Sequence, residues 1–201
     1  MYRGFNLTLG KPAFNEKSKN LGEGSYSNTK KIIYDDLDRF IGVNGIIDGS
    51  SMQNHWFPNV KADVFLSHSH ADLDLALNLA GELEFHYGIK TFIDSCVWGN
   101  YAGLLKQIDE KYCKNDEGNT YNYDKRNFST SHVHMMLSTA LTMMMDRTEC
   151  LIFLNTPKSV TAKTDIENKT QSPWIYSEIT TSGFLRERKP DREIPQQYIM
   201  L

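Results

Sequence analysis

The stretch Ala62-Asp63-Val64-Phe65-Leu66-Ser67, with His68-Ser69-His70 directly after it, decides the fold of this chain. The run is short, apolar and rich in strand-forming residues, so it predicts a buried β-strand. A helix is predicted over 71–87, because apolar side chains recur at intervals of three and four: Leu73, Ala76, Leu77, Ala80 and Leu83. Gly88 is expected to end this helix as a C-terminal glycine. A second strand is predicted over 89–94, and strand, helix, strand in this order indicates a parallel sheet.

The middle of the chain predicts two further helices and the central strand. A helix is expected over 101–112, and the polar segment 114–130 is expected to be a long insertion. The next helix is predicted to begin near Ser131, with a buried stripe of apolar side chains: Val133, Met136, Leu137, Ala140, Leu141 and Met144. The most hydrophobic run, 150–154, is predicted to be the central strand.

The C-terminal part of the chain predicts one more helix and one more strand. Ser172 suits the N-cap position and Pro173 the first helical position, which together favour a helix start. The apolar residues of 194–201 predict a fourth strand. The whole pattern therefore indicates an α/β fold built on a parallel sheet.

The first sixty residues read as an extension that packs on this main domain. Residues 1–30 show no periodicity and are expected to lie loosely over the rest of the chain. Residues 31–60 predict a helix, followed by a turn-rich stretch in which Trp56 and Phe57 are expected to be anchors. The predicted organisation is thus an extension over 1–60 and a main domain over 61–201.

Composition excludes several classes of protein. The 201 residues are 40% hydrophobic and 23% charged, which is enough apolar material for a packed core and too much for a disordered chain. No apolar stretch is long enough to span a membrane, and the first twenty residues lack the apolar segment of a secretory signal, so we expect a cytoplasmic protein. A net charge of -3 gives no basic surface for nucleic acid. Three cysteines without a C-x-x-C spacing are typical of reduced thiols.

Polar residues follow the predicted strands at the sheet edge where parallel α/β proteins bind ligands. Ser67-His68-Ser69-His70 follows the first strand, Asp94 to Gly99 follows the second, and Ser172 to Glu178 follows the central strand. The first of these segments begins a helix, whose free N–H groups favour an anion such as phosphate. Simple N-capping by Ser69 explains the same pattern equally well.

Trp174 and Glu178 are four residues apart on a predicted helix and therefore share one of its faces. An indole beside a carboxylate shields it from water, which suits a group that stabilises developing positive charge. A helix anchored by its tryptophan, with a surface glutamate, is the alternative interpretation. His132 and His134 are two residues apart on a helix and point in different directions, so no metal site is expected there.

The successive blocks resemble those of a TIR (Toll/interleukin-1 receptor) domain of the bacterial type, as found in Thoeris-type antiphage defence. The resemblance rests on Asp63 to Ser69, on Phe92-Ile93-Asp94 with its following loop, on 151–154, and on a closing W-x-x-x-E from Trp174 to Glu178. It covers roughly 61–201. The chain departs from the family pattern in its longer insertion at 114–130 and in ending before the last strand and helix that the family has, so either these elements are absent or the chain is part of a longer protein.

The resemblance implies a flavodoxin-like sheet with helices on both faces and cleavage of NAD at its nicotinamide N-glycosidic bond. The catalytic carboxylate would be Glu178, and NAD would be the substrate, with no further cofactor and no metal. The loop at about 95–101 corresponds to the family's BB loop, which covers the site and helps to assemble subunits. The substrate-binding residues would include Ser67, His68, Ser69, Asp94, Trp98 and Trp174. For Asp94, capping of the turn after its strand is an equally good interpretation.

The same resemblance implies partners and leaves two rival functions. A TIR enzyme of this type would self-associate through the domain and would reach a downstream effector protein through a nucleotide signal such as a cyclic ADP-ribose. The first rival is a non-enzymatic TIR adaptor, against which the intact W-x-x-x-E argues. The second is an enzyme similar to nucleoside deoxyribosyltransferases, which use a glutamate in related N-glycoside chemistry.

Overall fold

The computed structural model describes residues 3–10, 14–39, 60–96, 105–106, 108–115, 120–159 and 173–189. Its centre is a four-stranded sheet in the order β1-β4-β2-β3, in which every described pairing is parallel. The strands are β1 (Arg3–Leu7), β2 (Val64–Ser67), β3 (Thr91–Ile93) and β4 (Cys150–Leu154). The α/β class and the parallel sheet expected from the sequence are confirmed.

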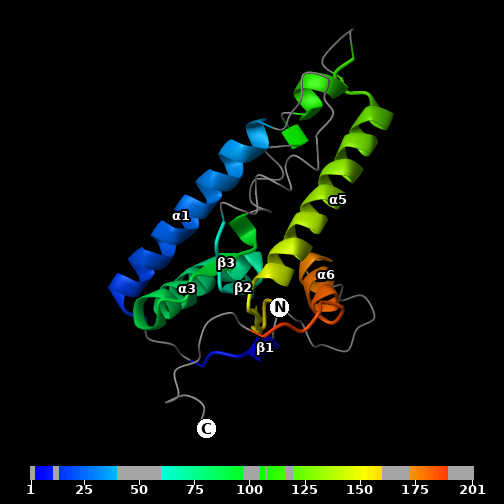
Figure 1. Cartoon of the computed structure of the whole chain (residues 1–201). Helices are drawn as coiled ribbons and strands as arrows, with labels where there is room; N and C mark the ends of the chain where they lie inside the picture. The colour runs from blue at the N-terminus through cyan, green and yellow to red at the C-terminus, as the bar shows by residue number, and fades with distance from the viewer. Residues whose placement is uncertain are drawn as a thin grey trace.

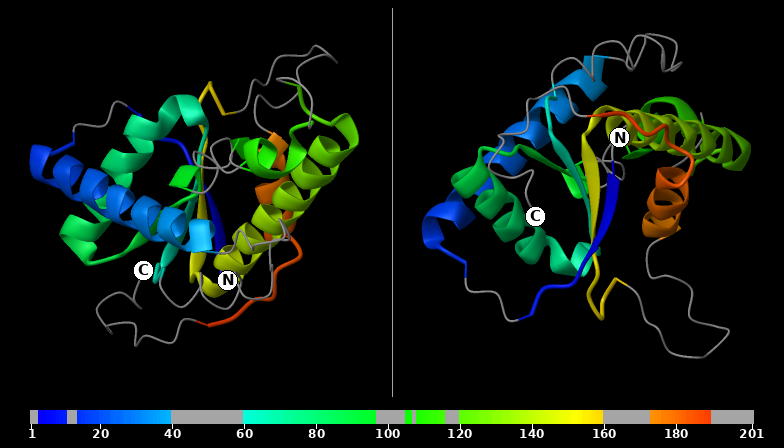
Figure 2. Two further views of the ribbon diagram at one scale, coloured as in Figure 1. Left: turned by 90° about the horizontal axis from the view of Figure 1, so that it is seen from above. Right: turned by 60° about the horizontal axis from the view of Figure 1, so that its bottom comes forward.

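Helices cover both faces of this sheet (Figures 1 and 2). One face carries α1 (Glu16–Arg39) and α3 (Leu73–Tyr87), and the other carries α5 (Tyr123–Arg147) and α6 (Pro173–Ser182). Short helical turns lie at η1 (His70–Asp72) and η2 (Asp109–Cys113). Two layers of helices around one sheet bury its apolar strands from both sides, which is why β2 reads as a continuous hydrophobic run.

The two inner strands, β4 and β2, contribute buried residues to the hydrophobic core. β2 is buried along its whole length, and it pairs with β4 from Val64 opposite Cys150 to Ser67 opposite Phe153. The prediction of a central strand over 150–154 is confirmed, because β4 lies between β1 and β2. The α3 helix is confirmed as well, and Gly88 ends it with a φ of 65°, a conformation that side-chain-bearing residues avoid.

The prediction that the helix after the polar segment 114–130 begins near Ser131 is wrong. The helix α5 begins at Tyr123, and the side chain of Asn122 caps it by accepting a 2.9 Å hydrogen bond from the backbone N–H of Lys125. Most residues of the first two turns are exposed, so they have no apolar stripe from which a helix could be read. The asparagine at the N-cap, Asn122, was the sequence feature from which this helix start could have been predicted.

The expectation that residues 1–30 lie loosely is also wrong. β1 pairs with β4 from Arg3 opposite Cys150 to Leu7 opposite Leu154, so the N-terminus supplies an edge strand of the sheet. The helix predicted within 31–60 begins much earlier, at Glu16, and packs against α3. Here Gly22 and Gly81 allow backbone contact, because an added Cβ at Gly81 would lie 1.7 Å from the carbonyl oxygen of Ser18.

Several predicted features lie outside the described residues. These are Trp56, Phe57, Trp98, Ser172, the fourth strand over 194–201 and much of the helix over 101–112. Pro173 is the first residue of α6, as predicted. No helix within the described ranges has both the length and the apolar character that crossing a membrane requires.

Candidate functional site

The carboxyl end of β2 meets helix α6 through one buried hydrogen bond. Ser67 is the last residue of β2, and its hydroxyl donates to Oε2 of Glu178 at 2.6 Å. Ser67 is fully buried and Glu178 is only 2% exposed. A carboxylate at this depth requires donors to offset its lost hydration, and the Ser67 hydroxyl is one of them. The alternative of a surface glutamate at this position is therefore excluded.

The next residue along the chain makes a second buried contact. Nδ1 of His68 lies 2.7 Å from Oδ1 of Asp94, which follows β3, and both side chains are buried. Burial alone would lower the pKa of His68, but the charge and hydrogen bond of Asp94, together with the backbone of Leu66 and the charge of Asp72, outweigh this effect, so the pKa is raised above 6.5. The same Oδ1 accepts the backbone N–H of Ser95 at 2.8 Å, so Asp94 also caps the turn after its strand.

Ser67, His68, Asp94 and Glu178 form what we call the sheet-edge site. Ser67 and His68 are consecutive, Asp94 follows the neighbouring strand, and Glu178 comes from a helix on one face of the sheet. Parallel strands place their carboxyl ends along one edge, so the Ser67–Glu178 pair and the His68–Asp94 pair both lie there, although the members of each pair are far apart in sequence. Their arrangement offers two carboxylates, one hydroxyl and one imidazole whose pKa is raised.

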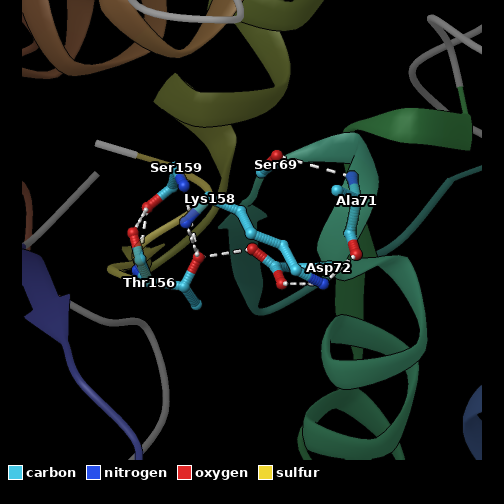
Figure 3. A network of polar contacts seen from close by, with 6 residues as sticks. All are labelled: Ser69, Ala71, Asp72, Thr156, Lys158 and Ser159. Atoms are coloured by element: carbon cyan, nitrogen blue, oxygen red, sulfur yellow. Dashed lines mark hydrogen bonds and ion pairs between the residues drawn. The ribbon is translucent and has the colours of Figure 1, made fainter. Parts of the chain in front are cut away.

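Ser69 has the capping role that the sequence left open. Its hydroxyl oxygen accepts the backbone N–H of Ala71 at 3.4 Å, at the start of η1 (Figure 3). Ser69 is 6% exposed. The N-capping interpretation is thus observed directly.

A network that the sequence did not reveal ties the loop after β4 to the start of α3 (Figure 3). The Thr156 hydroxyl donates to Oδ2 of Asp72 at 2.5 Å, and Nζ of Lys158 lies 3.4 Å from Oδ1 of the same carboxylate. Lys158 also donates to the carbonyl oxygen of Ala71 at 3.0 Å. The spacing of Ser69 and Asp72, typical of a capping box, was a signal for Asp72. Its partner Thr156 is 84 positions away, which no local pattern indicates.

Trp174 lies one turn before Glu178 and contacts the neighbouring helix. Its ring stacks on His134 of α5, with 5.0 Å between ring centroids and 19° between planes. His132 instead lies beside Phe128, and its Nδ1 is 3.1 Å from that residue's carbonyl oxygen. One face of the indole therefore packs against α5, which agrees with the interpretation of Trp174 as a helix anchor.

The N-terminal helix α1 reaches the loop that follows β3. The thiol of Cys96 donates to the carbonyl oxygen of Tyr26 at 3.9 Å, a distance allowed for sulfur. Burial raises the pKa of Tyr26, and it raises that of the Cys96 thiol further, so Cys96 stays protonated and is a poor nucleophile. These two groups are therefore structural neighbours of Asp94 and not candidates for covalent chemistry.

Trp98, expected to bind substrate, lies outside the described residues. Among the residues that are described, no cluster of three or more histidine, cysteine or acidic side chains has the geometry to hold a metal ion. Comparisons of the chain with protein-family models, with curated proteins and with solved structures gave no match.

Proposed function

We propose that this chain is a TIR-type enzyme that cleaves the nicotinamide N-glycosidic bond of NAD, with Glu178 as its catalytic carboxylate. The observation that carries the proposal is the buried hydrogen bond between Ser67 and Glu178. It sets the glutamate of the W-x-x-x-E motif at the carboxyl ends of parallel strands, where α/β proteins bind ligands. A carboxylate retained at 2% exposure is costly to bury, which is the usual mark of a functional group.

The chemistry needs few groups from the protein. The bond between C1′ of the ribose and the pyridinium nitrogen breaks, and its electron pair passes to the nitrogen, so nicotinamide leaves as a neutral molecule. No general acid is required, in contrast to a glycosidase with two carboxylates. The role of Glu178 is to stabilise the positive charge that develops on the ribose and to bind its hydroxyls.

The other members of the sheet-edge site orient this carboxylate and bind the rest of NAD. Ser67 fixes one oxygen of Glu178. His68, which pairs with Asp94, is assigned to the pyrophosphate, and Ser69 adjoins it. Asp94 is assigned to a ribose hydroxyl, and Trp98 and Trp174 to packing on rings of the substrate. NAD is the substrate here, and the reaction uses no further cofactor.

We assign a cyclic ADP-ribose as the product, released as a signal to a downstream effector in antiphage defence. After nicotinamide departs, the cationic ribose carbon bonds to the nearest nucleophile, which is either water or a nitrogen of the same molecule's adenine; either route releases one proton. A carboxylate in a site that excludes water favours the internal nucleophile. The proposal also includes self-association of the chain through the TIR domain and a cytoplasmic location.

One assay tests the function against both rivals. The protein is incubated separately with NAD and with a deoxynucleoside plus a free base, and products are resolved by mass. A product one water lighter than ADP-ribose supports cyclisation, and ADP-ribose alone supports an NAD hydrolase that makes no cyclic signal. Transfer of the deoxyribose between bases identifies a deoxyribosyltransferase. Turnover of neither substrate, with self-association in light scattering, identifies an adaptor.

A further inference from the structure

A cavity of about 490 Å³, lined by both polar and apolar side chains, lies between α1 and the amino ends of β2 and β3. The polar part of its wall is formed by Ser25, Asn28 and Thr29 of α1 and by Lys61, Lys90 and Thr91, which precede or begin the two strands, and the apolar part by Ile32 and Val60. The sheet-edge site is built at the carboxyl ends of the same strands. Because the strands are parallel, the cavity and the sheet-edge site lie at opposite edges of the sheet.

The cavity owes its shape to the packing of α1. Close contact at Gly22 and Gly81 holds α1 against α3, and one turn later the Ser25 hydroxyl donates to Oε2 of Glu84 at 2.6 Å. The α3 helix then ends at Tyr87, whereas α1 continues to Arg39. The turns of α1 that hold Asn28, Thr29 and Ile32 line the cavity together with residues at the amino ends of β2 and β3.

The charge of the lining favours an anion. Lys61 and Lys90 are exposed, and neither ammonium group pairs with an acidic side chain among the described residues. Glu84 is the one acidic residue of the described lining, and its Oε2 is already engaged by Ser25. Two lysines and one glutamate therefore give the described lining a net positive charge.

The remaining polar groups favour a ligand with hydroxyls. Oγ1 of Thr91 is buried and has no hydrogen-bond partner among the described residues, although buried hydroxyls nearly always have one. Asn28 and Thr29 belong to the same lining and carry an amide and a hydroxyl. The described lining holds no aromatic ring, so it offers no surface on which a nucleobase could stack.

We propose that this cavity is a binding site for a phosphorylated sugar. The phosphate is held by Lys61 and Lys90, and the sugar hydroxyls by Asn28, Thr29 and Thr91. The volume is in the range of natural small-molecule pockets. The site does not depend on the proposed NAD chemistry, since it shares no residue with the sheet-edge site.

Ribose 5-phosphate is the probe that tests this proposal, with binding to the full chain measured by titration calorimetry. We expect saturable binding at one site, weaker binding of inorganic phosphate, and no detectable binding of ribose, because the phosphate supplies the charge. The double variant Lys61→Gln, Lys90→Gln should weaken binding about tenfold or more. The matched control Lys125→Gln removes an exposed lysine of α5 and should leave binding unchanged.

Two further variants keep the result decisive. Thr29→Phe fills the cavity without changing its charge and should abolish binding. It gives an independent test in case the double lysine variant fails to fold. Glu178→Gln should bind ribose 5-phosphate as the wild type does, because it alters only the opposite edge of the sheet. The proposal is overturned if the wild type shows no saturable binding, or if Glu178→Gln loses it while the lysine and Thr29 variants retain it.

Discussion

The Ser67 hydroxyl donates a hydrogen bond to Glu178 across 111 positions of sequence, and it ties the last residue of β2 to the middle of α6. Both side chains are buried, so neither can exchange this contact for water without exposing the core. The contact therefore fixes how α6 sits over the sheet edge, and with it the position of the carboxylate on which the proposed chemistry depends.

Replacing Glu178 with glutamine tests that dependence. Glutamine keeps the size of the side chain and an oxygen that accepts the Ser67 hydrogen bond, but it removes the negative charge. Loss of one preorganised electrostatic group costs about 3 kcal/mol of transition-state stabilisation, so NAD turnover should fall at least about 100-fold. Turnover is measured by loss of NAD, and folding by the thermal transition.

The matched control is Glu187→Gln, which neutralises an exposed glutamate that follows α6. It should leave both turnover and melting unchanged. A folded Glu178→Gln variant with turnover near that of the wild type contradicts the assignment of this residue.

Ser67→Ala should destabilise the protein by about 1–3 kcal/mol, because it removes a donor from a buried carboxylate. The measurement is chemical denaturation followed by circular dichroism. Ser182→Ala is the control: it removes a hydroxyl that donates to a backbone carbonyl at the exposed end of α6, and it should change stability by less than about 0.5 kcal/mol. Equal effects of the two substitutions would mean that the Ser67 contact contributes nothing specific.

His68 is predicted to make stability depend on pH. Burial lowers its pKa, but Asp94, the backbone of Leu66 and the charge of Asp72 together raise it more, so the folded-state pKa lies above the ordinary 6.5. The stabilisation is therefore fully present below pH 6.5 and is lost as the pH rises through the folded-state value, by about 1.4 kcal/mol for each unit of difference. Denaturation of the wild type at successive pH values above 6.5 measures this loss.

Asp94→Asn separates the two causes of the shift. Without the carboxylate, burial opposes the charged imidazole with less compensation, so the pKa of His68 should fall. An NMR titration of the imidazole carbon-bound protons measures it directly. His86 is a suitable internal reference because it is exposed near the end of α3 and pairs with Glu82 instead of Asp94. An unchanged His68 pKa in the variant would exclude Asp94 as the cause.

The contact between α1 and α3 predicts opposite effects for glycines that look alike in sequence. A Cβ at Gly81 would overlap the backbone of α1, so Gly81→Ala should cost about 3 kcal/mol or more. Gly24 lies on α1 with open space around it, so Gly24→Ala should stabilise the helix by about 1 kcal/mol. Thermal denaturation of the two variants checks the difference in sign. Similar shifts for both would show that α1 does not pack on α3 through its backbone.

The elements predicted correctly are those whose signal is local. The strand at 64–67, the helix ending at Gly88, the strand at 150–154 and the helix beginning at Pro173 all carry their own apolar period or terminal residue. The start of α5 was missed because its first turns extend into solvent, where no apolar stripe is needed. β1 was missed because an exposed edge strand such as Arg3–Leu7 is specified by the partner strand β4 and hardly by its own residues.

For the sheet-edge site, sequence by itself determined which polar residues end the buried strands and that Glu178 shares a helix face with Trp174. Only the tertiary structure decided their partners: Ser67 for Glu178, Asp94 for His68 and His134 for Trp174. The physical reason is that hydrophobic burial follows a short period along the chain, whereas a hydrogen bond or a ring contact depends on where parallel strands and their covering helices end in space. The cavity beside α1 belongs to the same class, since its lining joins residues of α1 and α3 with residues at the amino ends of β2 and β3.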